Sequence, residues 1–351
     1  MTTPSNDFSP ATMRVIDAAI NRANEGLRVI EDYARMILDD RHLTERLKRL
    51  RHRFTEVIAP FNHEDRFLNR DTENDVGTDV KTESEFQRES THGVVQANMA
   101  RVQQSLRTIE EYAKTLNVDV AKALEPLRYE SYSLEKALLT TVLSLNNLNN
   151  AHLYVLVDGR KDETEFRQLI QSLVAGGVDI IQLRDKNLSV REIATRARVL
   201  NEICRPQSVR WIMNDRADLC VALGADGVHL GQEDLTVAAA RRIVGPAKLI
   251  GVSTHSIEQA RQAVVDGANY IGVGPIFHSR TKSFKQFVGT ELAKQVATEI
   301  KLPAFAIGGI NQENLNAVLK TGIGRVAIKG AIADSPNPTE IAQSFAQQLK
   351  R

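Results

Sequence analysis

RWIMNDRADLCVALGADGVHLGQED, residues 210–234, contains the pattern that most clearly indicates the fold. An apolar run, a segment with helical spacing over 216–223 and a second apolar run over 225–230 read as a strand, a helix and a strand. Asp215 and Asp234 each follow one of these strands, so two carboxylates come from neighbouring loops at the same edge of a parallel sheet. Hard oxygen ligands of this kind suit Mg²⁺. Taken singly, each Asp also fits the more common role of a turn residue or helix cap.

The same alternation of short apolar runs and helical segments continues through residues 151–351. The expected strands are 152–157, 178–183, 210–213, 225–230, 249–252, 270–274, 304–307 and 325–328. Eight such units in about 200 residues predict a TIM (β/α)8 barrel, whose active site lies on the loops after the strands. An open doubly wound sheet is the alternative, and the absence of a GxGxxG motif after the first strand disfavours it.

Residues able to carry chemistry follow the predicted strands repeatedly. They are Gln182, Arg184, Lys186, Asn214, Asp215, Asp234, Ser253, Ser279, Thr281, Lys282, Gly308 and Gly309. Each has an ordinary structural explanation, such as a surface cation, a tight turn, or a cap for the helix starting near Ser256. Together, two carboxylates among cations predict a Mg²⁺-bridged pyrophosphate. The glycine pair predicts a separate phosphate held by backbone N–H groups, and the loop 274–289 is long enough to close as a lid.

Residues 1–147 have a different pattern, with helical periodicity and almost no strand signal, which predicts an all-α domain. The segments 22–35 and 101–114 share the pattern R….LR.IE.YA, which indicates a duplicated helical unit with intrahelical ion pairs. The basic run 46–53 is either a solvated face or, through Arg49, Arg51, His52 and Arg53, a phosphate site. The tract NNLNN at 146–150 predicts the domain boundary, and the second domain spans 151–351.

The composition excludes several classes of function. The net charge is +1 over 351 residues, so no bulk electrostatic case exists for nucleic-acid or membrane binding. No apolar stretch is long enough to span a bilayer, and no leader is evident, so we expect a cytoplasmic protein. Cys204 and Cys220 have neither metal-like spacing nor a disulfide framework, and both are expected to be buried thiols.

Five strings of the second domain resemble thiamine phosphate synthase, in the order that the family has them. They are IQLRDK (181–186), MNDRADLCVALGADGVHLGQEDL (213–235), GVSTHS (251–256), YIGVGPIF.S.TK (270–282) and AIGGI (306–310). The resemblance implies a TIM barrel that joins hydroxymethylpyrimidine diphosphate to thiazole phosphate, giving thiamine phosphate and pyrophosphate. It implies a dissociative mechanism in which the diphosphate leaves before the thiazole nitrogen attacks.

The resemblance also assigns roles to residues. Gln182 would contact the pyrimidine, and Asp215 with Asp234 would hold Mg²⁺. The diphosphate would be bound by Arg184, Lys186, Asn214, Ser253 and Lys282, of which all but Asn214 are the expected catalytic residues. The thiazole phosphate would be bound by Ser279, Thr281 and the Gly308–Gly309 backbone. The chain departs from the family at Lys329-Gly330, where an aliphatic residue and Ser are common.

Residues 11 to about 145 resemble a helical domain fused ahead of this synthase in some bacteria, through INRANEGLRVIEDYAR, LKRLRH and RDTENDVGT. That resemblance implies a hydroxymethylpyrimidine-phosphate kinase-like activity, and a regulatory or dimerisation module is the alternative. For the barrel, the rival is a thiazole tautomerase that uses His255 as acid and base. The expected partners are the small-molecule substrates, and a homo-oligomer stays open.

Overall fold

The computed structural model describes residues 9–72, 75, 88–278 and 288–349. The chain divides into two compact units, residues 1–138 and 139–351, and the division falls inside helix α5 (Val118–Asn147). Within the described ranges, no helix is both long and apolar enough to cross a membrane.

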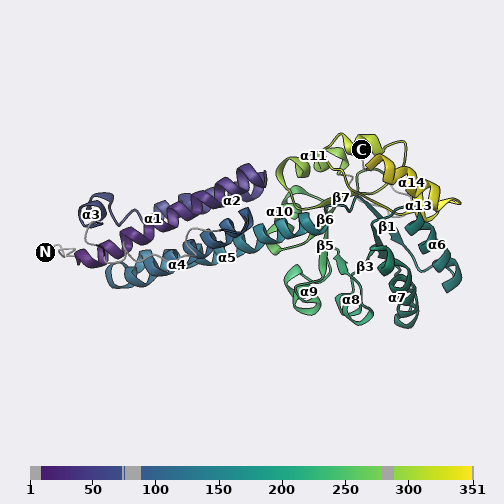
Figure 1. Cartoon of the computed structure of the whole chain (residues 1–351), viewed down its shortest axis with the longest axis horizontal. Helices are drawn as coiled ribbons and strands as arrows, with labels where there is room; N and C mark the ends of the chain where they lie inside the picture. The colour runs from purple at the N-terminus through teal and green to yellow at the C-terminus, as the bar shows by residue number, and fades with distance from the viewer. Residues whose placement is uncertain (1–8, 73–74, 76–87, 279–287, 350–351) are drawn as a thin grey trace. The chain divides into compact units, whose positions relative to one another are not determined.

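The second unit is a closed barrel in which each strand pairs in parallel with the next and β8 pairs with β1 (Figure 1). Its described strands are β1 (Leu153–Val157), β2 (Ile180–Leu183), β3 (Arg210–Asn214), β4 (Gly227–Leu230), β5 (Leu249–Thr254), β6 (Tyr270–Val273), β7 (Ala304–Ile307) and β8 (Val326–Ile328). The prediction of a (β/α)8 barrel is therefore confirmed. Several strands begin one or two residues later than expected, and β5 continues to Thr254.

Helices follow the strands and surround the barrel (Figure 1). They are α6 (Glu163–Ala175), α7 (Val190–Cys204), α8 (Ala217–Leu223), α9 (Val237–Val244), α10 (Ile257–Asp266), α11 (Gly289–Glu299), α12 (Leu315–Leu319), α13 (Gly330–Ala333) and α14 (Pro338–Leu349), with a short 3-10 turn at Arg205–Gln207. Side chains begin several of these helices by accepting a backbone hydrogen bond, as Ser189 does for α7 within a capping box. Both cysteines are buried free thiols, as expected.

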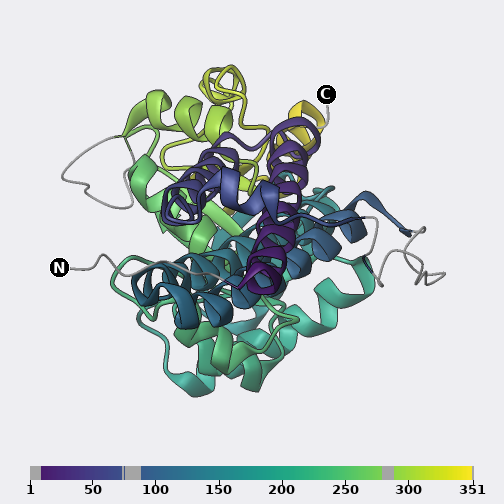
Figure 2. The ribbon, with the colours of Figure 1, turned by 90° about the vertical axis from the view of Figure 1, so that its left-hand side faces the viewer.

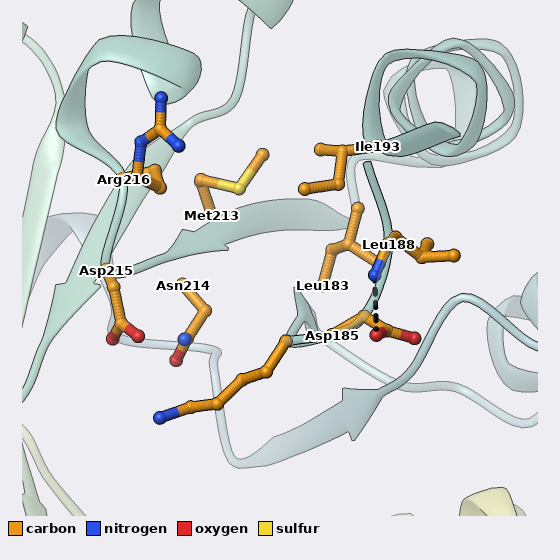
Figure 3. Close-up of a pocket in the computed structure, with 9 residues that line it drawn as sticks. Leu183, Asp185, Leu188, Ile193, Met213, Asn214, Asp215 and Arg216 are labelled. Atoms are coloured by element: carbon orange, nitrogen blue, oxygen red, sulfur yellow. Dashed lines mark hydrogen bonds between the residues drawn. The ribbon is translucent and has the colours of Figure 1, made fainter. Parts of the chain in front are cut away.

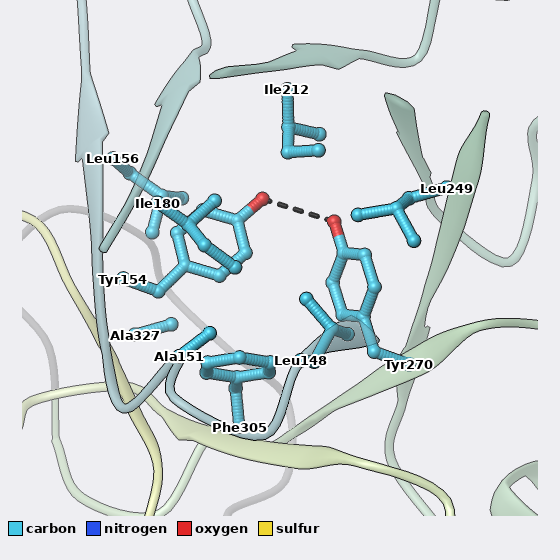
Figure 4. Packing of buried hydrophobic residues seen from close by; sticks show 10 residues of the cluster. All are labelled: Leu148, Ala151, Tyr154, Leu156, Ile180, Ile212, Leu249, Tyr270, Phe305 and Ala327. Atoms are coloured by element: carbon cyan, nitrogen blue, oxygen red, sulfur yellow. Dashed lines mark hydrogen bonds between the residues drawn. The ribbon is translucent and has the colours of Figure 1, made fainter. Parts of the chain in front are cut away.

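Aromatic side chains fill the interior of the barrel (Figure 4). The rings of Tyr154, Tyr270 and Phe305 pack with centroids 5.3–5.9 Å apart, and Leu148 lies in the same cluster with no exposed surface. Arg325 fixes the segment after α5 by donating to the carbonyl oxygen of Ala151 at 3.1 Å. The asparagine tract therefore contributes a core residue to the barrel unit as well as ending α5.

The first unit contains α1 (Pro10–Asp32), a π-helical turn (Tyr33–Ile37), α2 (Arg41–Val57), α3 (His63–Leu68), α4 (Thr91–Leu116) and the first part of α5. Helix α1 packs against α4 and α2 (Figure 1, Figure 2). At Gly26 a Cβ atom would lie 2.7 Å from Val102 Cγ2, so the two copies of the repeat meet at a position that only glycine fills without displacement.

The duplication extends to a second helix in each half. The buried Glu31 accepts a hydrogen bond from Arg51 of α2 at 2.8 Å, and the buried Glu110 accepts one from Arg128 of α5, also at 2.8 Å. Arg53 likewise pairs with Glu130. Arg51 and Arg53 are thus engaged in ion pairs, which favours a structural role for these two residues over the phosphate-site interpretation of the basic run 46–53.

Candidate active site at the carboxyl ends of the strands

The barrel brings most of the predicted site residues to the ends of β2, β3, β4, β5 and β7. Asn214 is the last residue of β3, and Asp215 follows it directly. Their side chains point to the same side of a pocket of about 280 Å³, whereas Arg216 points away and pairs with Asp218 (Figure 3). Lys186 also lines this pocket.

Asp215 has an unusual conformation and an unusual electrostatic environment. Its φ of 60° lies in the left-handed region, which few residues other than glycine adopt and which is common at functional sites. Burial, and then a hydrogen bond to Asp234 and that carboxylate's charge, raise the pKa of Asp215. The charges of Lys186 and Arg184 act on it in the opposite direction. Two carboxyl groups and two cations are therefore close enough to influence one another.

The structure shows which residues cap the helices next to Asp215, Asp234 and Ser253. Thr236, and not Asp234, caps α9; Asp234 instead accepts a hydrogen bond from the Gly231 N–H at 2.7 Å. Asp215 caps no helix, because the cap position of α8 is Arg216. Ser256 caps α10, which leaves the hydroxyl of Ser253 for another role. The cap interpretations of Asp215, Asp234 and Ser253 are therefore wrong, whereas the alternative that Asp215 and Asp234 are turn residues stays open.

The paired carboxylates fit a divalent cation of a particular kind. Among the described residues, no cluster of three or more His, Cys, Asp or Glu side chains is arranged to hold a metal. Two carboxylates alone do not suit zinc, which usually takes three or four protein ligands. Mg²⁺ usually takes one or two carboxylates and completes its coordination with phosphate and water. Asp215 and Asp234 could supply that number, and a cation held by them would offset the Asp234 charge, which after burial and a hydrogen bond contributes to the raised pKa of Asp215.

A chain of hydrogen bonds runs through the barrel beneath these charges. Gln182 Nε2 donates to the Tyr154 hydroxyl at 2.7 Å, and the Tyr154 and Tyr270 hydroxyls are 3.1 Å apart (Figure 4). His229 Nδ1 lies 3.3 Å from the Tyr270 hydroxyl, and His229 Nε2 lies 2.9 Å from Ser253 Oγ. The chain therefore connects Ser253, at the end of β5, to Gln182, at the end of β2.

The protonation of His229 gives this chain a direction. Burial, and then the positive charge of Arg184, lower the pKa of His229 to about 4, although Asp234 acts in the opposite direction. A neutral imidazole donates from one ring nitrogen and accepts at the other. If Nδ1 accepts from Tyr270, then Nε2–H donates to Ser253 Oγ, and the proton of the Ser253 hydroxyl is available for an anion. Sequence reasoning missed His229, although alternation along β4 places it on the inward side together with Gly227.

Gln182 is buried, with 2% of its surface exposed, and its Oε1 has no hydrogen-bond partner in the described structure. A buried acceptor without a partner is costly, by about 1–3 kcal/mol. A water or a bound molecule with a hydrogen-bond donor could satisfy this atom.

The glycine pair after β7 has backbone conformations that favour glycine. Gly308 and Gly309 both have positive φ, and a Cβ at Gly309 would lie 2.3 Å from the carbonyl oxygen of His278. Their carbonyl oxygens accept hydrogen bonds from Phe277 N and Asn314 Nδ2. Successive N–H groups in such a turn form a concave site for an anion.

The lid residues Ser279, Thr281 and Lys282 lie outside the described residues. At the end of β8, Lys329 pairs with Asp158 at 3.6 Å, so its charge is directed toward the loop after β1. The rival acid and base His255 is exposed and has its Nδ1 2.5 Å from the carbonyl oxygen of Gly274.

Comparison with known proteins gives two family matches that together cover most of the chain. Residues 153–332 match the family described as Thiamine monophosphate synthase, and residues 14–137 match the ThiD2 family. A thiamine-phosphate synthase of Rhodopirellula baltica is 44% identical over 99% of this chain and 95% of its own length. One from Synechocystis is 39% identical over 97% of each chain. Among solved structures, the thiamine phosphate pyrophosphorylase of Pyrococcus furiosus is 32% identical, with a TM-score of 0.53, over 58% of this chain and 99% of that chain.

Proposed function

The chain belongs to the thiamine monophosphate synthase family of transferases in thiamine biosynthesis, and from this we propose the reaction that its barrel carries out. The barrel joins 4-amino-5-hydroxymethyl-2-methylpyrimidine diphosphate to 4-methyl-5-(2-phosphoethyl)thiazole, and it releases thiamine phosphate and pyrophosphate. The observation that carries the proposal is the convergence of Asp215, Asp234, Arg184 and Lys186 at one end of the barrel. Such a set of charges suits a diphosphate that leaves as an anion.

The diphosphate end of the first substrate is bound by Arg184, Lys186, Asn214, Ser253 and Lys282. Arg184 and Lys186 neutralise charge that grows on the leaving group as its C–O bond breaks, and preorganised cations stabilise that charge without reorganisation. In the tautomer in which His229 Nε2–H donates to Ser253 Oγ, the proton of the Ser253 hydroxyl can be donated to the same oxygens. Asp215 and Asp234 would hold Mg²⁺, which supplies Lewis-acid stabilisation of a departing diphosphate when bound.

The pyrimidine end enters the barrel toward Gln182. The 4-amino group of the pyrimidine donates to Gln182 Oε1, and this satisfies the buried acceptor that otherwise has no partner. A position on the floor formed by Tyr154 and Tyr270 suits an aromatic ring. Since the pyrimidine itself stabilises the methylene cation, the mechanism is dissociative and needs no nucleophilic side chain.

The second substrate is held by its phosphate at Gly308–Gly309, together with Ser279 and Thr281. The positive φ of both glycines and their place after β7 support this, because phosphate sites of this fold commonly lie on glycine-rich loops after the last strands. Binding there holds the thiazole nitrogen over the methylene carbon that the diphosphate leaves, so the new C–N bond forms between two positioned groups.

The products of the purified protein test this proposal. We expect thiamine phosphate and pyrophosphate in equal amounts from the two substrates, with the rate falling sharply when a chelator removes Mg²⁺ and recovering when Mg²⁺ returns. Conversion of the thiazole without release of pyrophosphate would instead support the tautomerase alternative. In that case His255→Ala would abolish activity. Under our proposal the same change leaves the rate of pyrophosphate release within about twofold, because His255 is not among the groups that stabilise the leaving diphosphate.

For the helical unit we propose a separate role, and its match to the ThiD2 family leaves two candidates. One is phosphorylation of hydroxymethylpyrimidine phosphate, which would supply the diphosphate substrate of the barrel; the other is an interaction module without turnover. Incubating the whole chain with ATP and the pyrimidine monophosphate separates them, because only the first produces the diphosphate. We further propose that the whole protein works in the cytoplasm.

A further inference from the structure

Packing accounts for most charged residues of the internal repeat. In the first copy, Glu31 pairs with Arg28 at 3.5 Å and with Arg51 at 2.8 Å. The second copy repeats this arrangement, since Glu110 pairs with Arg107 and Arg128 at 2.7 and 2.8 Å. These ion pairs hold each copy of the repeat to the helix that follows it. They explain the LR.IE part of the motif by stability alone.

The first arginine of each copy is not explained by such an ion pair. Arg22 and Arg101 occupy equivalent positions of the repeat, and in the described structure neither has a hydrogen-bond or ion-pair partner. Both line one pocket of about 510 Å³ between α1 and α4. That volume lies in the range of sites for small ligands, about 300–1,000 Å³.

The remaining lining of this pocket favours an anion. No Asp or Glu lies among its lining residues, so nothing there offsets the two positive charges. Gln104, the buried Ser105 and Thr108 add polar groups along α4, and Ala19 with Ala97 and Ala100 keeps the space open. Two guanidinium groups on one pocket repel each other unless a shared anion lies between them. Each can donate two parallel hydrogen bonds to a phosphoryl group.

We propose that this Arg22–Arg101 pocket binds the phosphoryl group of a small phosphorylated molecule. The site is separate from the charge cluster at the strand ends of the barrel, and it does not rest on the reaction proposed there. The duplication explains its origin, because pairing two copies of the helix brings two copies of the same arginine to one pocket. A single copy would provide only half of it.

Calorimetry on the full chain tests the proposal with inorganic pyrophosphate as the probe, in buffer without Mg²⁺. The starting protein carries Arg184→Ala and Lys186→Ala, which weaken binding at the barrel. Adding Arg22→Ala and Arg101→Ala should weaken the remaining binding by at least about tenfold, because two charge-assisted contacts are lost. Arg35→Ala with Arg49→Ala is the matched control, since it removes two exposed arginines of the same unit that have no described partner. It should leave the affinity unchanged.

Arginine labelling provides a second measurement that needs no change in the helical unit. Phenylglyoxal should modify Arg22 and Arg101 slowly when pyrophosphate is present, whereas Arg35 and Arg49 should react equally with and without it. The proposal would be overturned if pyrophosphate slowed the labelling of none of the four arginines. It would also be overturned if the test and control variants lost the same affinity for pyrophosphate. A change in oligomeric state on Arg22→Ala with unchanged pyrophosphate binding would overturn it as well, because the pocket would then be an interface between copies.

Discussion

Acidification should destabilise the barrel through His229. Its pKa in the folded chain is about 4, against an ordinary value of 6.5. Between these values the unfolded chain binds a proton that the folded chain does not, so stability falls as the pH falls through this range. From pH 7 to pH 5 these two pKa values give a decrease of at most about 2 kcal/mol in the free energy of unfolding. The figure is an upper limit, because water that reaches the half-buried ring from the strand ends would reduce it.

Urea unfolding at the two pH values measures this effect. Trp211 is the single tryptophan of the chain and is buried in β3, so its fluorescence reports on the barrel unit. The variant His229→Gln can keep hydrogen bonds to Tyr270 and Ser253 but cannot take up a proton. We expect the free energy of unfolding of the wild-type protein to fall by up to about 2 kcal/mol more than that of this variant between pH 7 and pH 5.

The matched control is His63→Gln, which removes an exposed histidine of α3 and should behave as the wild-type protein does. Equal losses of stability in the wild-type protein and in His229→Gln would contradict this prediction. They would mean that His229 is protonated in the folded barrel without penalty, and the direction assigned to the hydrogen-bond chain would then be wrong.

Two further predictions concern the substrates. Ser253→Ala should lower kcat about tenfold through loss of a charge-assisted hydrogen bond. Ser256→Ala should instead lower the free energy of unfolding by about 1 kcal/mol through loss of the α10 cap. Similar kcat values for the two variants would contradict this prediction. Gly309→Ala, whose Cβ would lie 2.3 Å from a carbonyl oxygen at a φ of 63°, should raise the Kd of the thiazole phosphate about tenfold, since the turn must shift. Gly324→Ala meets nothing within 4 Å and should leave that Kd unchanged; equal calorimetric Kd values for the two glycine variants would exclude the glycine turn as the phosphate site.

The barrel and its site edge could be predicted because both depend on local patterns. Short apolar runs separated by helical segments are visible in one sequence, and residues such as Asp215 follow their strands directly. The π-helical turn at 33–37 could not be predicted, because its residues continue an ordinary helical spacing. The buried segment around Leu148 was similarly concealed by the polar residues on both sides of it.

Contacts between distant residues were the part that the sequence did not reveal. The chain from Gln182 to Ser253 crosses the barrel through Tyr154 and Tyr270, and a tyrosine at the start of a strand looks like any other core residue. The pairing of Glu31 with Arg51 is also long-range. A signal for it existed, since Leu-x-x-Leu-Arg recurs at 47–51 and 124–128, and extending the repeat to a second helix would have found it.

Under the proposed reaction, Asp215 serves the departure of the diphosphate, and replacing this residue shows whether it does. Pyrophosphate release from the two substrates would be measured for Asp215→Asn and for Asp218→Asn, a nearby exposed carboxylate that pairs with Arg216. We expect Asp215→Asn to lower kcat at least about a hundredfold, as loss of one preorganised electrostatic group typically does, and Asp218→Asn to leave it nearly unchanged. Equal pyrophosphate release by the two variants would contradict the account.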